Sequence, residues 1–362
     1  MKYTAETDEL PARVSGLTRV TIVIPAYNAA DTLVCAVRSA LAQTLDGVEI
    51  YIVDDCSTDN TWEIVQVLWQ QCTRLRASRL KENRGRAYVG NFAAERATGK
   101  WIAILDADDW YRPERLERIV TAAEAAGTEM GSDNQYLIDP GLQTIVGTAF
   151  RRIGREKTLD LDSFLDGSDA TSNFDYGMLK PVFLREFLLR HELEYYVPAR
   201  RGQDYYMNLC FFAAGGRATV LDEPFYYYVQ PFGRVSRQWS AATRKRYPFE
   251  LMLQTNAHFY NKFYANFSPR QRRRLAGRSK QFQHLATLDR LREAFHDRDY
   301  RRVVALLAAD FPGVWLIATK LWLRRKYGHL LKKSASVTPS FRPPATLSPD
   351  HLDRSVGSID RS

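Results

Sequence analysis

The chain has 362 residues, 45% of them hydrophobic, and a net charge of +9. This length allows one large domain or two modest ones with a substantial core. The four cysteines form no CxxC pair, which argues against a disulfide framework or a zinc site and for reduced thiols in the cytoplasm. No stretch reaches the ~18 apolar residues that span a bilayer, and the polar N-terminus has no signal-peptide pattern. The basic balance predicts an anionic partner: a nucleic acid, a phosphorylated ligand or an anionic membrane surface.

Strands and helices alternate up to residue 110. Residues 1–18 are expected to form a loose leader. Buried strands are predicted at 20–28, 48–55, 75–80 and 101–105, with helices in the segments between them. This alternation predicts a parallel sheet with right-handed crossovers.

The pattern is less regular after residue 111. We expect a helix up to Gly127, a strand at 129–139, a loop-rich stretch at 140–175, a helix from about Pro181, a helix that begins near Asp204, and a strand, turn and strand at 217–230. Beyond about residue 240 the chain becomes basic, aromatic and helical, and its tail is rich in Ser, Pro and Thr. The predicted division is therefore a leader at 1–18, a catalytic domain at 19–238, a helical basic region at 239–333 and a disordered tail at 334–362.

The strand at 101–105 runs directly into Asp106, Asp108 and Asp109. Carboxylates this close repel one another, and burying them unpaired would cost several kcal/mol. A divalent cation resolves the repulsion, because such ions favour hard oxygen ligands. The alternative is a solvated turn that caps the helix starting near Arg112. Because the cluster follows a strand, it should lie at the carboxyl edge of the sheet, where α/β sheets bind ligands.

Polar side chains also end the first two strands. These side chains should converge on one site with the acidic cluster and with a basic turn. The residues after the strands are Asn28, Asp31, Asp54 and Asp55, and the basic turn contributes Arg84 and Arg86. Acids, amides and cations at one edge fit a nucleoside diphosphate with a bridging metal. The chain has no GxxxxGK[ST] loop and no GxGxxG after its first strand, so neither ATP hydrolysis nor nicotinamide chemistry is favoured.

Four segments together resemble a family 2 glycosyltransferase with the GT-A fold, over roughly residues 18–236. They are VTIVIPAYNAADTL, YIVDDCSTDNT, ENRGRAYVGNFAAERATGKWIAILDADDWYRP and GQDYY. Within the family, the chain is similar to bacterial transferases that build exopolysaccharides such as succinoglycan. The resemblance implies an α/β fold with a Rossmann-like, mostly parallel sheet flanked by helices. It also implies a metal-dependent, inverting transfer from a nucleotide-sugar, in particular a UDP-sugar, to the hydroxyl of a glycan or a lipid-linked oligosaccharide.

The resemblance assigns roles on the donor side. Pro25, Ala26, Tyr27 and Asn28 match the segment that cradles the nucleoside, and Asp31 sits on the helix just after it. Asp55, or its neighbour Asp54, matches the carboxylate that pairs with uracil, and Arg84 lies in the turn near the base and ribose. Asp106 and Asp108 match the DxD pair, with Asp106 towards the ribose and metal-bound water and Asp108 on Mn²⁺ or Mg²⁺.

The resemblance also assigns a base and a closing loop. Asp204 matches the general base that deprotonates the acceptor, although Gln203 stands where many relatives have Glu. Arg234 lies in a segment, 233–236, that matches imperfectly the loop closing on the diphosphate. Without the resemblance, Asp204 would be interpreted as a helix N-cap.

The basic C-terminal region admits several interpretations. In 311–333 an apolar, Trp-rich half adjoins a Lys- and Arg-rich half, which suits the surface of an anionic membrane on the inner face of the cell. A helix packed on the catalytic domain explains the same pattern equally well. We do not expect nucleic-acid binding, because no recognised motif is present. Two rivals to a transferase remain, a non-catalytic scaffold of a polysaccharide-assembly complex and a nucleic-acid-binding protein.

Overall fold

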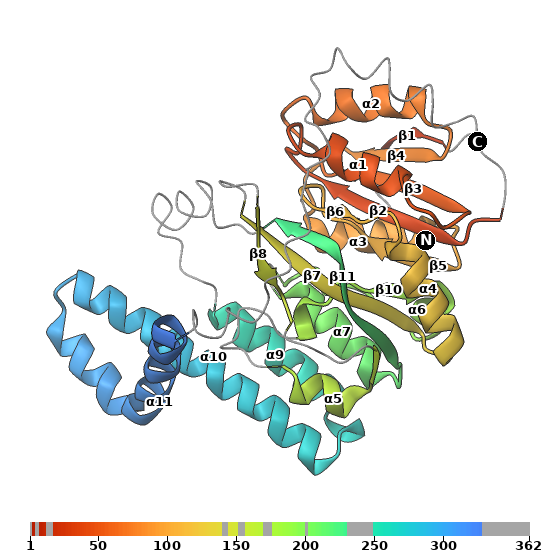
Figure 1. Cartoon of the computed structure of the whole chain (residues 1–362). Helices are drawn as coiled ribbons and strands as arrows, with labels where there is room; N and C mark the ends of the chain where they lie inside the picture. The colour runs from red at the N-terminus through yellow and green to blue at the C-terminus, as the bar shows by residue number, and fades with distance from the viewer. Residues whose placement is uncertain are drawn as a thin grey trace.

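The computed structural model describes residues 2–3, 7–11, 17–139, 144–150, 156–168, 176–199, 202–229 and 249–327. One mixed sheet with the strand order β1-β4-β3-β2-β5-β10-β7-β11-β6 forms its centre. Figure 1 shows α1 and α2 beside the N-terminal strands at one end of the molecule, and α10 and α11 at the other.

The N-terminal half confirms the predicted alternation. Its four parallel strands are β2 (Val20–Ala26), β3 (Val48–Asp54), β4 (Leu75–Leu80) and β5 (Trp101–Ile104), and the helices between them are α1 (Leu33–Leu41), α2 (Thr61–Gln71) and α3 (Arg86–Arg96). Every residue of β3 is buried, as expected of a central parallel strand covered on both faces. Ala26 pairs with Asp54, so β2 and β3 deliver their final residues to the same edge.

The second half of the sheet is mixed. The short β10 (Val182–Leu184) lies antiparallel between β5 and β7 (Met130–Asp139), whereas β11 (Ala218–Val229) runs parallel to β7. The remaining elements are β6 (Trp110–Tyr111), α4 (Arg115–Ala126), β8 (Thr144–Thr148), β9 (Glu156–Leu159), α5 (Leu161–Asp166), η1 (Tyr176–Met178), α6 (Arg185–Arg190) and α7 (Gln203–Ala213). The turn predicted within 217–230 is a register shift between Leu221 and Pro224 inside the single strand β11, because proline leaves a gap in the ladder without ending the strand.

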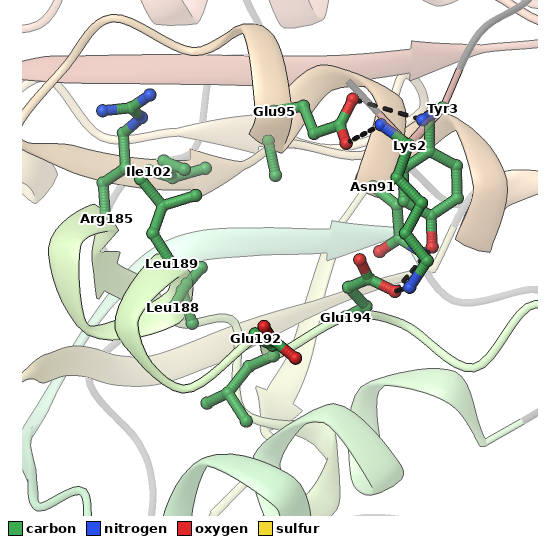
Figure 2. Close-up of a pocket in the computed structure, with 12 residues that line it drawn as sticks. Lys2, Tyr3, Asn91, Glu95, Ile102, Arg185, Leu188, Leu189, Glu192 and Glu194 are labelled. Atoms are coloured by element: carbon green, nitrogen blue, oxygen red, sulfur yellow. Dashed lines mark hydrogen bonds and ion pairs between the residues drawn. The ribbon is translucent and has the colours of Figure 1, made fainter.

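The prediction of a loose leader is wrong for the described N-terminal residues. β1 (Thr7–Leu10) pairs antiparallel with β4 at the sheet edge. Tyr3 is buried, and its hydroxyl donates to Glu194 at 2.8 Å. Figure 2 shows Lys2 and Tyr3 against Glu95 and Glu194, at one side of a cavity of about 290 Å³. The strand TDEL gave no signal, because an edge strand this short and polar has no apolar alternation.

The C-terminal region is helical, as predicted, and consists of α9 (Phe249–Phe263), η2 (Tyr264–Asn266), α10 (Pro269–His296) and α11 (Tyr300–Tyr327). A capping box between Ser268 and Gln271 starts α10. The helix α11 is kinked at Asp310, two residues before Pro312, because proline removes a helical hydrogen bond. Within the described part of the chain, no helix combines the length and apolarity needed to cross a membrane.

Two of the C-terminal helices pack on the sheet-bearing part of the chain. Tyr206 of α7 stacks on Phe259 of α9 with ring centroids 4.9 Å apart, and Arg278 of α10 lies 3.6 Å from the ring centroid of Tyr205. The helix α11 packs along α10 through a small cluster that includes Leu291, Val303 and Val314. The predicted division at 238/239 and the predicted tail at 334–362 lie outside the described residues.

Candidate active site

A cavity of about 520 Å³ opens at the carboxyl ends of β2, β3 and β5. Its lining includes eight of the residues that the sequence singled out: Pro25, Ala26, Tyr27, Asn28, Asp55, Arg86, Asp106 and Asp108. Tyr228 lines it as well. The parallel register of β2, β3 and β5 explains this convergence, because equivalent ends of parallel strands reach the same edge.

The loop after β2 is fixed by hydrogen bonds to the loop after β3. Asn28 has a positive φ of 50°, a conformation that asparagine tolerates better than most residues. Its side-chain carbonyl accepts from the backbone N–H of Thr58 at 2.8 Å, and its own N–H donates to the Ser57 hydroxyl at 2.9 Å. These bonds hold Tyr27 at the cavity with 50% of its surface exposed.

The two carboxylates that end β3 point to different places. Asp54 is fully buried and accepts hydrogen bonds from the hydroxyl and the N–H of Ser57, with Arg79 Nε 3.2 Å away. Asp55 lines the cavity and accepts from the N–H groups of Arg84 and Gly85 at 2.7 and 2.8 Å. Burial raises the pKa of Asp55, and these two N–H groups oppose that rise. Of the two alternatives, Asp55 is therefore the carboxylate placed to meet a ligand.

Asp106 is held by two cations. Arg86 Nη2 lies 2.8 Å from one of its oxygens, and Lys180 Nζ lies 2.6 Å from the other. Burial alone would raise the pKa of Asp106, but the two cations outweigh it and lower the pKa to about 2. Asp106 is therefore an anion whose two oxygens each have a partner.

The same two cations reach Asp204. Its Oδ2 lies 3.4 Å from Arg86 Nη1 and 3.8 Å from Lys180 Nζ. The N-cap of α7 is Gly202, with a φ of 70°, and no side chain caps this helix. The interpretation of Asp204 as the N-cap is therefore wrong, because the left-handed cap falls two residues earlier. Asp204 is joined to the cavity through Arg86.

The next two carboxylates differ in exposure. Asp109 is buried and accepts from the Tyr226 hydroxyl at 2.6 Å and the Val229 N–H at 2.8 Å, which ties the acidic loop to β11. Burial, and then the charge of Asp108, raise the pKa of Asp109. Asp108 is exposed at the cavity. Asp109 therefore stabilises the loop, and Asp108 is available to a ligand.

These residues fit a divalent ion in part. Among the described residues, no three His, Cys, Asp or Glu side chains gather into a metal cluster. The Asp106 and Asp108 carboxylates at the cavity nevertheless match the preference of Mg²⁺ for one or two carboxylates, with substrate phosphates and waters completing the shell. Asp108 has the better access of the two, because both Asp106 oxygens face cations.

Four of the predicted site residues that the structure describes do not line the cavity: Asp31, Asp54, Arg84 and Asp204. The Arg84 guanidinium instead pairs with Glu82. Arg234 lies outside the described residues. Lys180 was missed, because a single lysine in an apolar stretch gives no sign of a partner 74 residues away.

Comparisons with known proteins agree with this architecture. The Glycosyl transferase family 2 model matches residues 21–173. The succinoglycan biosynthesis proteins ExoO and ExoU of Rhizobium meliloti are 36% and 34% identical over 63% and 56% of this chain. The chain spans 65% of the length of ExoO and 60% of the length of ExoU.

Two solved structures share the fold. The mannosyltransferase PcManGT from Pyrobaculum calidifontis, in complex with GDP-Man and Mn²⁺, aligns with a TM-score of 0.53 and 20% identity over 90% of this chain and 87% of its own. TarS 1-349 of S. aureus, in complex with UDP-GlcNAc, aligns with a TM-score of 0.50 and 16% identity over 80% of this chain and 90% of its own. The predicted GT-A class and the resemblance to succinoglycan-type proteins are confirmed. Residues 21–173 thus resemble glycosyltransferase family 2.

Proposed function

We propose that this protein is an inverting glycosyltransferase that moves a sugar from a nucleotide-sugar, in particular a UDP-sugar, to an acceptor hydroxyl in exopolysaccharide biosynthesis. One observation carries the proposal. The cavity joins the exposed ring of Tyr27 to the carboxylates of Asp106 and Asp108, and Arg86 links it to a further carboxylate on Asp204. An aromatic face, a metal-compatible acid pair and a separate acid are the groups that this reaction needs.

The donor would lie along the cavity from Tyr27 to Asp108. The Tyr27 ring offers a flat apolar face to the base, and Asp55 can accept an N–H of the base. Asp106 would bind the ribose and a metal-bound water. The Arg86 guanidinium, whose side chain is 39% exposed, can bind diphosphate oxygens, for which its fork geometry is well matched.

Asp108 would hold Mn²⁺ or Mg²⁺ against the diphosphate. When bound, the ion would act as a Lewis acid that stabilises charge on the departing nucleoside diphosphate. PcManGT is in complex with Mn²⁺ together with GDP-Man, which supports the choice of ion. Arg234 would belong to the loop that closes on the diphosphate.

Asp204 would act as the general base. It would take the proton from the acceptor hydroxyl while that oxygen attacks the anomeric carbon on the face opposite the diphosphate, which inverts the configuration. Arg86 Nη1 and Lys180 Nζ lie 3.4 and 3.8 Å from its carboxylate and hold it beside the cavity.

The acceptor would be a glycan or a lipid-linked oligosaccharide. A relative from Escherichia coli, 35% identical over 33% of this chain and 46% of its own length, is named UDP-Glc:alpha-D-GlcNAc-diphosphoundecaprenol beta-1,3-glucosyltransferase WfaP. Its name describes a UDP-sugar donor and a lipid diphosphate acceptor, which supports both choices for this chain.

We also propose that α11 docks on an anionic membrane, where such acceptors reside. Large apolar side chains on its outer surface are more than half exposed, namely Tyr300, Val304, Phe311, Trp315 and Leu316. Residues 298–326 carry seven Lys and Arg against two Asp. Aromatic and apolar side chains beside cationic ones suit the interface of an anionic bilayer. The protein would then work at the inner face of the cell membrane.

Calorimetric titration of the full chain tests the proposed function. The probes are UDP-glucose, UDP-galactose, UDP-GlcNAc and GDP-mannose, each with Mn²⁺ and with EDTA. We expect one of them to bind in the presence of Mn²⁺ and to release its nucleoside diphosphate when acceptor lipid is added. Binding without release for every acceptor would favour the scaffold. Failure to bind any nucleotide-sugar, together with salt-dependent binding to arbitrary DNA, would favour a nucleic-acid-binding protein.

A further inference from the structure

Two acids and two cations of the site form a closed ring of alternating charge. In order around the ring they are Asp106, Arg86, Asp204 and Lys180, with successive N–O separations of 2.8, 3.4, 3.8 and 2.6 Å. The four residues come from four separate segments: the loop after β5, the start of α3, the start of α7 and the residues before β10. We call this set the charge ring.

The two cations of the charge ring differ in access to the cavity. Arg86 lines the cavity and its side chain is 39% exposed. The Lys180 side chain is only 5% exposed, and its Nζ lies 5.5 and 5.4 Å from the ring centroids of Tyr226 and Tyr228. A ligand in the cavity would contact Arg86 directly, whereas Lys180 contacts the carboxylates of Asp106 and Asp204 from the protein interior.

Lys180 is itself held in place by a buried ion pair. Its backbone carbonyl accepts from Arg115 Nη2 at 2.7 Å, and Arg115 is paired with Asp133 at 2.8 Å. Both side chains of that pair are fully buried. Supporting contacts of this kind fix the position of a charged group to within a fraction of an ångström.

We propose that Lys180 is a positioning residue, whose buried ammonium fixes the donor-side carboxylate of Asp106 relative to the candidate base Asp204. This inference rests on the proposed function. Removing the ammonium leaves one oxygen of the partly buried Asp106 without its cation and leaves Asp204 with Arg86 alone. Asp106 would then lose its fixed orientation towards the donor, although Lys180 never touches the donor.

The test is a double-mutant cycle of Lys180→Met and Asp106→Asn in the full-length protein. Methionine keeps the length of the side chain and removes its charge. Lys100→Met is the matched control, because Lys100 also lies 2.6 Å from a carboxylate oxygen, that of Glu124, but on the surface with 57% of its side chain exposed. The readouts are the dissociation constant for UDP with Mn²⁺ by calorimetry and the midpoint of thermal unfolding.

If Lys180 acts through Asp106, Lys180→Met weakens UDP–Mn²⁺ binding by about 10- to 100-fold, the usual worth of a hydrogen bond to a charged group. In the Asp106→Asn background the same change has less than about a twofold effect, because coupled residues are not additive. Lys180→Met also lowers the unfolding midpoint by roughly 4–7 °C, and adding Asp106→Asn restores part of that loss. Lys100→Met changes neither readout.

Several results would overturn the inference. Unchanged or tighter UDP binding by folded Lys180→Met would show that the ammonium does not position Asp106, and so would equal losses in the two backgrounds. If Lys180→Met does not fold, the Lys180→Met/Asp106→Asn variant should regain a folded state. Its failure to do so would also show that the ammonium does not act through Asp106. If the wild-type protein binds no nucleoside diphosphate, the proposed function is overturned, and this inference with it.

Discussion

Asp204→Asn separates catalysis from binding and folding. The amide keeps the size of the side chain and removes the charge that accepts a proton. General-base catalysis contributes about 10²–10⁴-fold, so kcat should fall by that factor, which is about 2.7–5.4 kcal/mol at about 1.36 kcal/mol for each factor of ten. Donor affinity should hardly change, because Asp204 does not line the cavity, and a base that acts only in the chemical step contributes through the transition state.

The cost of this substitution to stability can be worked out from the contacts. Asp204 lies 3.4 and 3.8 Å from its two cations, and each cation keeps Asp106 at 2.8 or 2.6 Å. No cation is therefore left unpaired. The loss in free energy of unfolding should be about 1 kcal/mol or less, because both contacts of Asp204 are longer than those that each cation keeps with Asp106.

The assay follows release of nucleoside diphosphate at saturating donor and acceptor, with calorimetry for donor affinity and chemical denaturation for stability. Asp166→Asn is the matched control, because Asp166 also faces two arginines, Arg270 and Arg274, both at 2.8 Å, but lies outside the site on α5. The control should retain its kcat. Turnover of Asp204→Asn within a few-fold of the wild type would refute the assignment of Asp204 as the base.

Three further predictions concern the metal, the core and the membrane. Asp108→Asn should abolish sugar transfer and weaken Mn²⁺-dependent UDP binding, and unchanged affinity with metal would exclude it as a ligand. Arg115→Met should lower the free energy of unfolding by about 3–5 kcal/mol because it leaves the Asp133 charge buried without its partner, and adding Asp133→Leu should recover most of the loss. Denaturation curves that show a loss below about 1 kcal/mol would contradict the contribution of this buried pair. Flotation with anionic liposomes should weaken with salt and with Phe311→Ser and Trp315→Ser together, whereas equal recovery on neutral vesicles would argue against docking.

Sequence patterns predicted the parallel half of the sheet because its strands are buried on both faces. The runs that became β2, β3 and β5 are apolar along almost their whole length, and such runs bounded by breakers are a strong signal. The short β10 and the edge strand β1 gave no comparable signal. Their positions depend on pairing with β5, β7 and β4, which are contacts distant in sequence.

The candidate site was predictable where its residues follow strands. Asn28, Asp55 and Asp106 follow β2, β3 and β5 closely, so the topology alone brings them together. The choice between Asp54 and Asp55 required the direction of each side chain. Lys180 and the N-cap Gly202 could not be predicted, because one depends on a distant buried partner and the other on a backbone conformation.

Proton NMR of donor turnover tests most directly whether this cavity transfers glycosyl units with inversion. The full chain is incubated with Mn²⁺, acceptor lipid and the α-linked nucleotide-sugar that binds in calorimetry, with Asp108→Asn run in parallel. We expect the wild-type protein to consume the donor and to form the β-anomeric product first, together with nucleoside diphosphate, and the variant to form none. A product that retains the α configuration, or a donor that binds and is never consumed with any acceptor, would contradict inverting transfer at this site.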